Sequence, residues 1–146
     1  MYDSILLPFD GSEEAREGVD HGLDLAFGCG STVHGLYVID LPGAPRTVYI
    51  RDDEEEMRRE YHEYGEKVTG ELCDRATEMG LDCESIIKTG SPAKEITDYA
   101  ESEGIDAIVL GSAYRGKFRA LLGSTAERVV RTSEVPVITV RQTMDG

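Results

Sequence analysis

Short apolar runs alternate with amphipathic helical segments along the whole chain, and this alternation is the strongest constraint on its fold. Ala107–Leu110 is continuously apolar, as a strand buried on both faces is, whereas Cys83–Lys88 alternates polar and apolar residues like an edge strand. The five runs predicted as strands are Ser4–Pro8, Thr32–Ile39, Cys83–Lys88, Ala107–Leu110 and Val135–Val140. Strands that are separated by helices pair in parallel, so the sequence predicts a doubly wound, five-stranded parallel α/β sheet with helices on both faces.

Capping residues mark where the helices between these runs begin. Ser12 follows a turn and precedes two glutamates, which favours a helix N-terminus at that position. Ser91 and Pro92 mark a second start, because proline fits the first helical position. The acidic run Asp52–Glu56 begins the longest helical segment, and the last helix is predicted over Thr125–Thr132. The long segment carries an apolar stripe that we predict to lie in the core: Met57, Tyr61, Tyr64, Val68, Leu72 and Ala76.

The size of the chain fits one domain. Its 146 residues, 40% of them hydrophobic, suffice to bury a core, and we find no internal repeat, so we predict a single domain over residues 1–146. No apolar run approaches the length of a membrane span, and no basic region precedes the apolar stretch at the N-terminus, so neither a membrane segment nor a signal peptide is predicted. Cys29, Cys73 and Cys83 are an odd count without metal spacing, so we expect free thiols in a reducing cytoplasm and no structural metal.

Charge is distributed unevenly along the chain. Acidic residues outnumber basic ones by 29 to 15, and the net charge is −14. Such a surface repels nucleic acid and anionic membranes, so neither is predicted as a partner, and it also suits a protein that works at high salt. Residues 111–141 are the exception, because they hold six basic and two acidic residues, a local charge of +4. Two interpretations stay open: a basic helix face that balances an acidic neighbour, or a field that attracts an anionic ligand.

Three segments follow the carboxyl ends of predicted strands, where ligands bind in sheets of this class. They are "PFDGS" after the first strand, "YVID" at the end of the second, and the glycine loop after the fourth. Each has a plain structural explanation by itself. Asp10 can cap a turn, Asp40 can be a solvated strand end, and Gly111 can permit a tight exit from the strand. Together, at one end of one sheet, they favour a ligand site.

The loop after the fourth strand, "GSAYRGKF", is one residue short of the phosphate loop of nucleotide triphosphatases. Gly111, Gly116 and Lys117 fall on that pattern, but Phe118 stands where a hydroxyl should bind Mg²⁺. The next helix start is signalled only at Gly123, whereas a triphosphatase loop leads straight into its helix. The dinucleotide pattern G-x-G-x-x-G is also absent from the first strand–helix turn. Both of these enzyme classes are therefore disfavoured.

A wider pattern includes the same loop. The segment from Gly111-Ser112 through Leu121-Leu122-Gly123-Ser124, followed by "TAERVVRTSEVPVITV", resembles the C-terminal signature of the universal stress protein family. "ILLPFDGSEEA", "LYVID", "TGSPAKEI" and "DAIVLGS" occur in the family's order, so the resemblance covers essentially the whole chain. It implies a Rossmann-like sheet with strand order 3-2-1-4-5 and a homodimer. In one of the family's two branches, it also implies ATP bound without a metal-centred catalytic apparatus.

The resemblance also implies site residues. Pro8 and Asp10 would border the adenosine, and Val38 would present its backbone to adenine. The phosphates would be held by Gly111, Gly123, Ser124 and Thr125. Apart from the resemblance, we predict that Arg115 and Lys117 in the same loop supply positive charge. The nucleotide-binding branch carries G-x₂-G-x₉-G-[ST], and this chain departs from it twice. Tyr114 stands in place of the second glycine, and the gap from there to Gly123 is eight residues. Tyrosine does not reproduce the backbone freedom of glycine, so we predict weak binding of ATP, or of AMP or ADP.

Two functions follow from these observations. The first is a cytoplasmic, nucleotide-responsive stress module that forms a homodimer through Val135–Val140, because an unpaired apolar edge strand is avoided in soluble proteins. The second is a stress or chaperone-like interaction protein that binds no nucleotide and keeps only a vestigial site. We predict no enzymatic activity, because the histidines are interpreted as structural rather than as a nucleophile or base: His21, His34 and His62.

Overall fold

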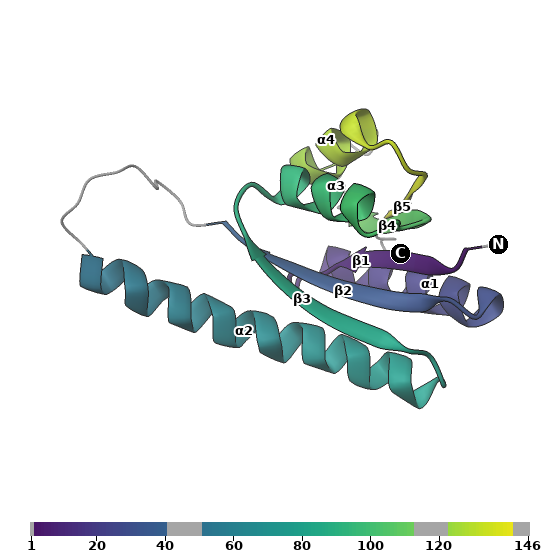
Figure 1. Ribbon diagram of the computed structural model, residues 1–146, viewed down its shortest axis with the longest axis horizontal. Coiled ribbons are helices and arrows are strands. Elements are labelled where there is room, and N and C mark those ends of the chain that lie inside the picture. The colour runs from purple at the N-terminus through teal and green to yellow at the C-terminus, as the bar shows by residue number, and fades with distance from the viewer. Residues whose placement is uncertain (1, 41–50, 113–122, 142–146) are drawn as a thin grey trace, which may run out of the picture.

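The computed structural model describes residues 2–40, 51–112 and 123–141, which form one sheet with helices on both faces (Figure 1). In chain order the elements are β1 (Ser4–Pro8), α1 (Glu13–Cys29), β2 (Thr32–Ile39), α2 (Arg51–Glu78), β3 (Cys83–Thr89), α3 (Pro92–Ser102), β4 (Ala107–Ser112), α4 (Ser124–Thr132) and β5 (Val137–Arg141). The strand order is β3-β2-β1-β4-β5, and every pairing is parallel. The predicted α/β sheet and its order 3-2-1-4-5 are therefore confirmed.

Two apolar layers hold this sheet between the helices. Ile5 and Leu7 of β1 pack with α1 and α2 on one face, whereas Leu6 packs with α3 and α4 on the other. Ile108 and Val109 of β4 are likewise buried, one on each face. Alternate side chains of a strand point to opposite faces, so a central strand covered on both sides must be apolar throughout.

The C-terminal strand begins two residues later than the sequence pattern predicts, at Val137 instead of Val135. The Ser133 hydroxyl accepts a hydrogen bond from the Val135 N–H at 3.0 Å and donates one to the Val135 carbonyl at 2.8 Å. Pro136 has no N–H to offer a neighbouring strand. The N–H groups of Val135 and Pro136 are thus engaged locally or missing, although the Pro136 carbonyl already accepts a hydrogen bond from the Ile108 N–H at 2.9 Å. Regular pairing with β4 starts at Val137.

The predicted core stripe of α2 is buried along only part of its length. Val68, Leu72 and Ala76 are buried, but Met57 is 39% exposed, and Tyr61 and Tyr64 are 37% and 42% exposed. A 28-residue helix is about 42 Å long, whereas the seven-residue strand β3 spans about 23 Å. The N-terminal half of α2 therefore extends past the sheet (Figure 1). The prediction is correct for the C-terminal half and wrong for the N-terminal half.

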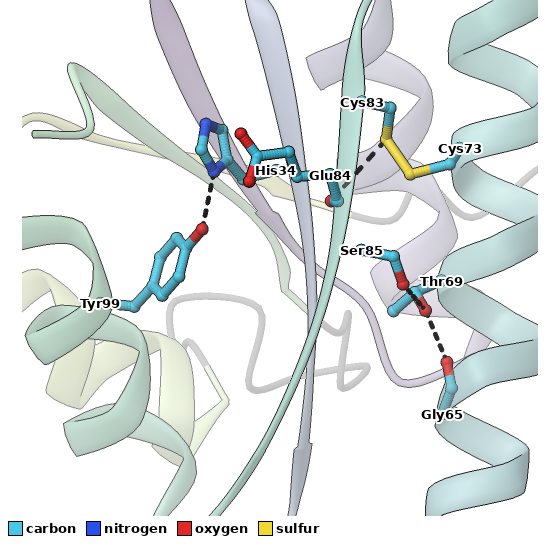
Figure 2. Close-up of a disulfide and its surroundings, with 8 residues drawn as sticks. All are labelled: His34, Gly65, Thr69, Cys73, Cys83, Glu84, Ser85 and Tyr99. Atoms are coloured by element: carbon cyan, nitrogen blue, oxygen red, sulfur yellow. Dashed lines mark hydrogen bonds between the residues drawn. A yellow bond between two sulfur atoms is a disulfide. The ribbon is translucent and has the colours of Figure 1, made fainter. Parts of the chain in front are cut away.

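The expectation of three free thiols is wrong for two of the cysteines. Cys73 of α2 and Cys83 of β3 form a disulfide, with an S–S distance of 2.11 Å and Cα atoms 5.3 Å apart (Figure 2). Cys29 is a free cysteine. The chain reverses direction between α2 and β3, so that two residues ten positions apart lie next to each other. The disulfide thus fastens the end of α2 to the edge of the sheet.

Among the residues that the structure describes, no helix combines the length and the apolar character that a membrane crossing requires.

Candidate functional site

A cavity of about 410 Å³ opens at the carboxyl ends of β1, β2 and β4. This volume lies within the range of about 300–1,000 Å³ that is typical of small-molecule sites. The sheet side of the cavity is formed by residues in the C-terminal halves of these strands or just after them: Pro8, Phe9, Asp10, Leu36, Val38, Asp40, Leu110 and Gly111. The helix side is formed by residues at or near the N-termini of three helices: Ser12 and Ala15 for α1, Pro92 and Ile96 for α3, and Gly123, Ser124, Thr125 and Ala126 for α4.

The loop after β1 is held in place by its own side chains and by α2. The Asp10 carboxylate accepts a hydrogen bond from the Ser12 N–H at 2.9 Å, so Asp10 does cap a turn. The Ser12 hydroxyl then accepts from the Ala15 N–H at 3.2 Å and caps α1. Gly11 adopts a φ of +85°, a conformation that favours glycine, and the Tyr64 hydroxyl donates to the Asp10 carbonyl at 3.3 Å. These contacts fix the position of Asp10 at the cavity.

Tyr37 lies behind this loop, where it packs against Tyr64 and has a raised pKa. Its ring packs edge-on against Tyr64, with the ring centroids 5.7 Å apart. Burial raises the pKa of Tyr37 above its ordinary value, and the Tyr64, Tyr61 and Asp10 groups add to the shift. The Tyr37 phenol therefore stays protonated and adds no charge to this side of the cavity.

Helix α4 begins at the cavity without a capping side chain. Its N-cap is Gly123, with φ −64° and ψ 157°, and no side chain among the described residues bonds to its first turn. The Glu127 N–H makes the first helical bond, to the Gly123 carbonyl at 2.9 Å. The N–H groups of Ser124, Thr125 and Ala126 come before this bond and have no acceptor within the helix. A helix N-terminus of this kind presents free donors and a positive dipole end to an anion.

Gly123 itself needs no special backbone conformation, because its φ and ψ are open to any residue. An ideal Cβ built on Gly123 meets no described atom within 4 Å. Neither conformation nor packing against the described residues therefore requires glycine at this position. Glycine at a ligand site is commonly there to let the ligand approach the backbone closely.

A second hollow of about 420 Å³ adjoins the first and carries part of the predicted basic cluster. The two share Asp40, Pro92, Ser124 and Thr125, and the second is also lined by Arg128 and Arg131 of α4. Arg131 forms an ion pair with Glu127 one turn earlier, which leaves the charge of Arg131 partly neutralised. The predicted basic cluster therefore contributes to this hollow through Arg128 more than through Arg131.

Of the eight predicted site residues, seven line the first cavity: Pro8, Asp10, Val38, Gly111, Gly123, Ser124 and Thr125. Arg115, the eighth, lies outside the described residues, as do Lys117 and Tyr114. Sequence reasoning did not assign Ile96 and Pro92 of α3 to the site, although Ser91-Pro92 marked a helix start. The helix that starts at Ser91-Pro92 follows a predicted strand, so its first residues could have been expected at the carboxyl end of the sheet. That expectation would have identified Pro92 and Ile96 as candidates for the site.

The histidines lie away from this cavity. His34 of β2 is buried on the α3 side, and its Nδ1 lies 2.7 Å from the Tyr99 hydroxyl (Figure 2). Burial raises the pKa of Tyr99 to about 12, so the phenol stays protonated and the hydrogen bond lies in the core. His21 and His62 are exposed on α1 and α2. Within the described ranges, no group of three His, Cys, Asp or Glu side chains is arranged to hold a metal ion.

Comparison with known proteins identifies the family. The universal stress protein family matches residues 1–141. The chain belongs to this family. Universal stress protein MJ0531 of Methanocaldococcus jannaschii is 31% identical over 144 residues, which cover 97% of this chain and 84% of that protein. Universal stress protein G of Escherichia coli O157:H7 is 32% identical over 146 residues, which cover 97% of this chain and all of that protein.

Solved structures show the same fold. Hypothetical protein MJ0577 superimposes with a TM-score of 0.83 at 28% identity, over 99% of both chains. A universal stress protein solved in complex with cAMP reaches a TM-score of 0.73 at 20% identity, over 97% of this chain and 99% of its own. A family protein of Arabidopsis thaliana solved with AMP bound reaches 0.69 at 18% identity, over 98% and 94%. At these identities the last two establish a shared fold.

Proposed function

We propose that this universal stress protein binds an adenine nucleotide in the 410 Å³ cavity and responds to it as a dimeric stress module. One observation carries the proposal: segments far apart in the sequence bring seven of the residues that the family resemblance implied to a single cavity. Proteins of this fold solved with cAMP and with AMP support an adenine nucleotide as the ligand class. ATP is the first candidate, and AMP and ADP are its relatives.

In this proposal each part of the cavity has a separate task. Pro8 and Asp10 border the adenosine, and the Val38 backbone faces adenine. The phosphates lie at Gly111 and at the first turn of α4, where free N–H groups and the helix dipole favour negative charge. Each charge-assisted hydrogen bond contributes about 1.5–3 kcal/mol, so losing one to the shortened loop weakens binding roughly tenfold to a hundredfold. Binding is therefore weak, and hydrolysis is slow or absent.

The dimer belongs to the same proposal. Strand β5 lies at the edge of the sheet, and Val137, Ile138 and Val140 are only partly buried in the single chain. Pairing of this strand with its copy in a second chain would cover the apolar edge. Light scattering after gel filtration, in low and in high salt, should give the mass of two chains. A single-chain mass at micromolar concentration in both conditions would contradict the dimer.

Titration calorimetry of the purified protein with ATP and with AMP tests the nucleotide. Saturable heat at submillimolar to millimolar concentration is the expected result. Absence of heat with both nucleotides would instead support the alternative, an interaction protein with a vestigial site.

The cytoplasmic location stays a prediction. The disulfide is a reason to test it, because disulfides are rare in cytosolic proteins.

A further inference from the structure

Helix α1 crosses the carboxyl end of β4 at unusually close range, and a glycine makes the approach possible. Gly18 lies in the middle of α1 and is buried. An ideal Cβ built on it would lie 2.8 Å from the Leu110 carbonyl carbon, 3.0 Å from the Gly111 Cα and closer still to the Gly111 nitrogen. Real Cβ atoms essentially never approach to under 3.0 Å. Any side chain at position 18 would therefore push α1 and β4 apart.

Close approach is the only described reason for glycine at this position. Gly18 lies within a regular helix and is not among the described glycines with positive φ, so its backbone does not require glycine. A glycine in a helix interior costs about 1 kcal/mol relative to alanine. The atoms it meets belong to the backbone of β4, and Leu110 and Gly111 are paired there with Thr139 and Val140 of β5, beyond the part of β4 that pairs with β1. Strand backbone that is paired in the sheet cannot move aside as the far end of a flexible side chain can.

The contact bears directly on the candidate site, because Leu110 and Gly111 both line the cavity. We infer that Gly18 is a positioning residue for the nucleotide site. Its missing side chain lets α1 rest on β4, and this contact sets where Gly111 presents its backbone to a ligand phosphate. The inference rests on the proposed function and deepens it. Binding groups must be held to within about 0.5 Å, so a displacement of this strand end should be measurable as lost affinity.

The same helix supplies a matched control. Gly22 lies four residues after Gly18 and is also buried. A Cβ there would overlap the Leu7 side chain, lying 3.3 Å from its Cγ and Cδ1 and closer to Cδ2. Leu7 is a core residue of β1 and does not line the cavity. Gly22→Ala therefore disturbs packing under α1 without touching the strand end that faces the ligand.

The test compares Gly18→Ala, Gly22→Ala and wild type by urea unfolding and by calorimetry with ATP and with adenosine. Both variants should unfold at lower urea. Only Gly18→Ala should lose ATP affinity, by roughly tenfold, which is the loss of about one phosphate hydrogen bond. Adenosine affinity should match wild type in both variants, because the contact acts at the phosphate end. Unchanged ATP affinity in folded Gly18→Ala, or an equal loss in both variants, would overturn the inference.

Two further measurements separate this inference from the proposed function and from a failure to fold. If the wild-type protein binds none of these ligands, the proposed function is overturned. Amide hydrogen exchange then tests whether Gly18 positions the end of β4. Faster exchange at Leu110 and Gly111 in Gly18→Ala alone supports it, and unchanged exchange overturns it. If Gly18→Ala does not fold, an ATP titration of wild type followed by NMR replaces it. Binding should shift the Gly18 amide resonance more than that of Gly22, and equal shifts would contradict the contact.

Discussion

Helices α2 and α4 cover opposite faces of one sheet, and they are held to it in different ways (Figure 1). Helix α2 is tied to other elements by a disulfide to Cys83, by a hydrogen bond of 2.6 Å between Thr69 and Ser85, and by an ion pair with Asp20. Figure 2 shows the first two of these ties side by side. Helix α4 packs through Ala126 and Val129, and its described side-chain hydrogen bonds stay within the helix.

This difference in attachment suggests that α2 contributes mainly to stability and α4 mainly to ligand binding. Elements that carry ligand contacts are commonly drawn from the less stable parts of a fold, because they must rearrange or leave polar groups open. No side chain of the described residues caps the N-terminus of α4, so its first N–H groups are such a set of donors. Helix α1, which starts at the same cavity, is capped by its own Ser12. Tyr64 of α2 contacts the Asp10 loop, but the three ties named above lie further along the helix. We therefore expect changes in the C-terminal part of α2 to lower stability without lowering affinity, and changes at the start of α4 to do the reverse.

The largest effect is expected from Gly123→Val. The valine side chain would occupy space that the nucleotide needs, so calorimetry with ATP should give no detectable binding. The backbone at Gly123 is compatible with valine and no described atom obstructs its Cβ, so the melting temperature should stay close to that of wild type. A stable variant that binds ATP normally would remove Gly123 from the site, and an unstable variant would contradict the expectation that glycine is dispensable for folding at this position.

Loss of the disulfide should be the largest stability effect. Cys73→Ser should lower the free energy of unfolding by about 2–3 kcal/mol, because it frees a loop of ten residues in the unfolded chain. Urea unfolding measures this difference. Reductant should lower the stability of wild type by a similar amount and leave the variant unchanged. ATP affinity should be retained, and a parallel loss of affinity would show that α2 and the site are coupled.

Proline at position 124 isolates one backbone donor of α4. Ser124→Pro removes the N–H at the first helical position, where proline is well tolerated, and Gly123 already has the extended backbone that precedes proline. ATP affinity should fall roughly tenfold or more. Ser124→Ala removes only the hydroxyl and serves as the control in the same calorimetric assay. Equal affinities of the two variants would mean that the Ser124 N–H contributes nothing.

No effect is expected from restoring the triphosphatase hydroxyl. Phe118→Ser supplies the residue that binds Mg²⁺ in triphosphatase loops, but the predicted helix start remains at Gly123 instead of at the lysine. Phosphate release from ATP should therefore stay at background with and without Mg²⁺. Hydrolysis that depends on Mg²⁺ in this variant would show that the loop is a damaged triphosphatase loop after all.

The sequence predicted the fold because its local signals agree with one another. Apolar runs such as Ala107–Leu110 and caps such as Ser12 each identify an element without knowledge of its neighbours. The place of the cavity was predictable for the same reason, since the carboxyl ends of parallel strands lie together, whereas the roles of its residues stay predictions. The features that could not be predicted depend on the relative lengths and positions of elements in the folded chain. The exposure of Tyr61 follows from the length of α2 relative to β3, and the disulfide follows from how α2 lies on that strand.

The contact between Gly18 and β4 is another feature that could not be predicted from the sequence. Two glycines four residues apart in α1 signal that something approaches the helix closely, but only the placement of α1 on the sheet shows that Gly18 meets β4 and that Gly22 meets Leu7. The boundary of β5 was shifted for a local reason, the hydrogen bonds of Ser133, which apolar periodicity does not report. The contribution of Arg115 lies outside the described residues and stays a prediction.

The most direct test of the central claim, that the open first turn of α4 binds a nucleotide phosphate, is an NMR titration of the ¹⁵N-labelled protein with ATP. The amide resonances of Gly111, Ser124, Thr125 and Ala126 should move and saturate together at submillimolar to millimolar ATP. Adenosine should move the resonances near Asp10 and Val38 but leave those of α4 almost in place. If neither ATP nor AMP at millimolar concentration produced saturable shifts at the start of α4, the claim would be contradicted.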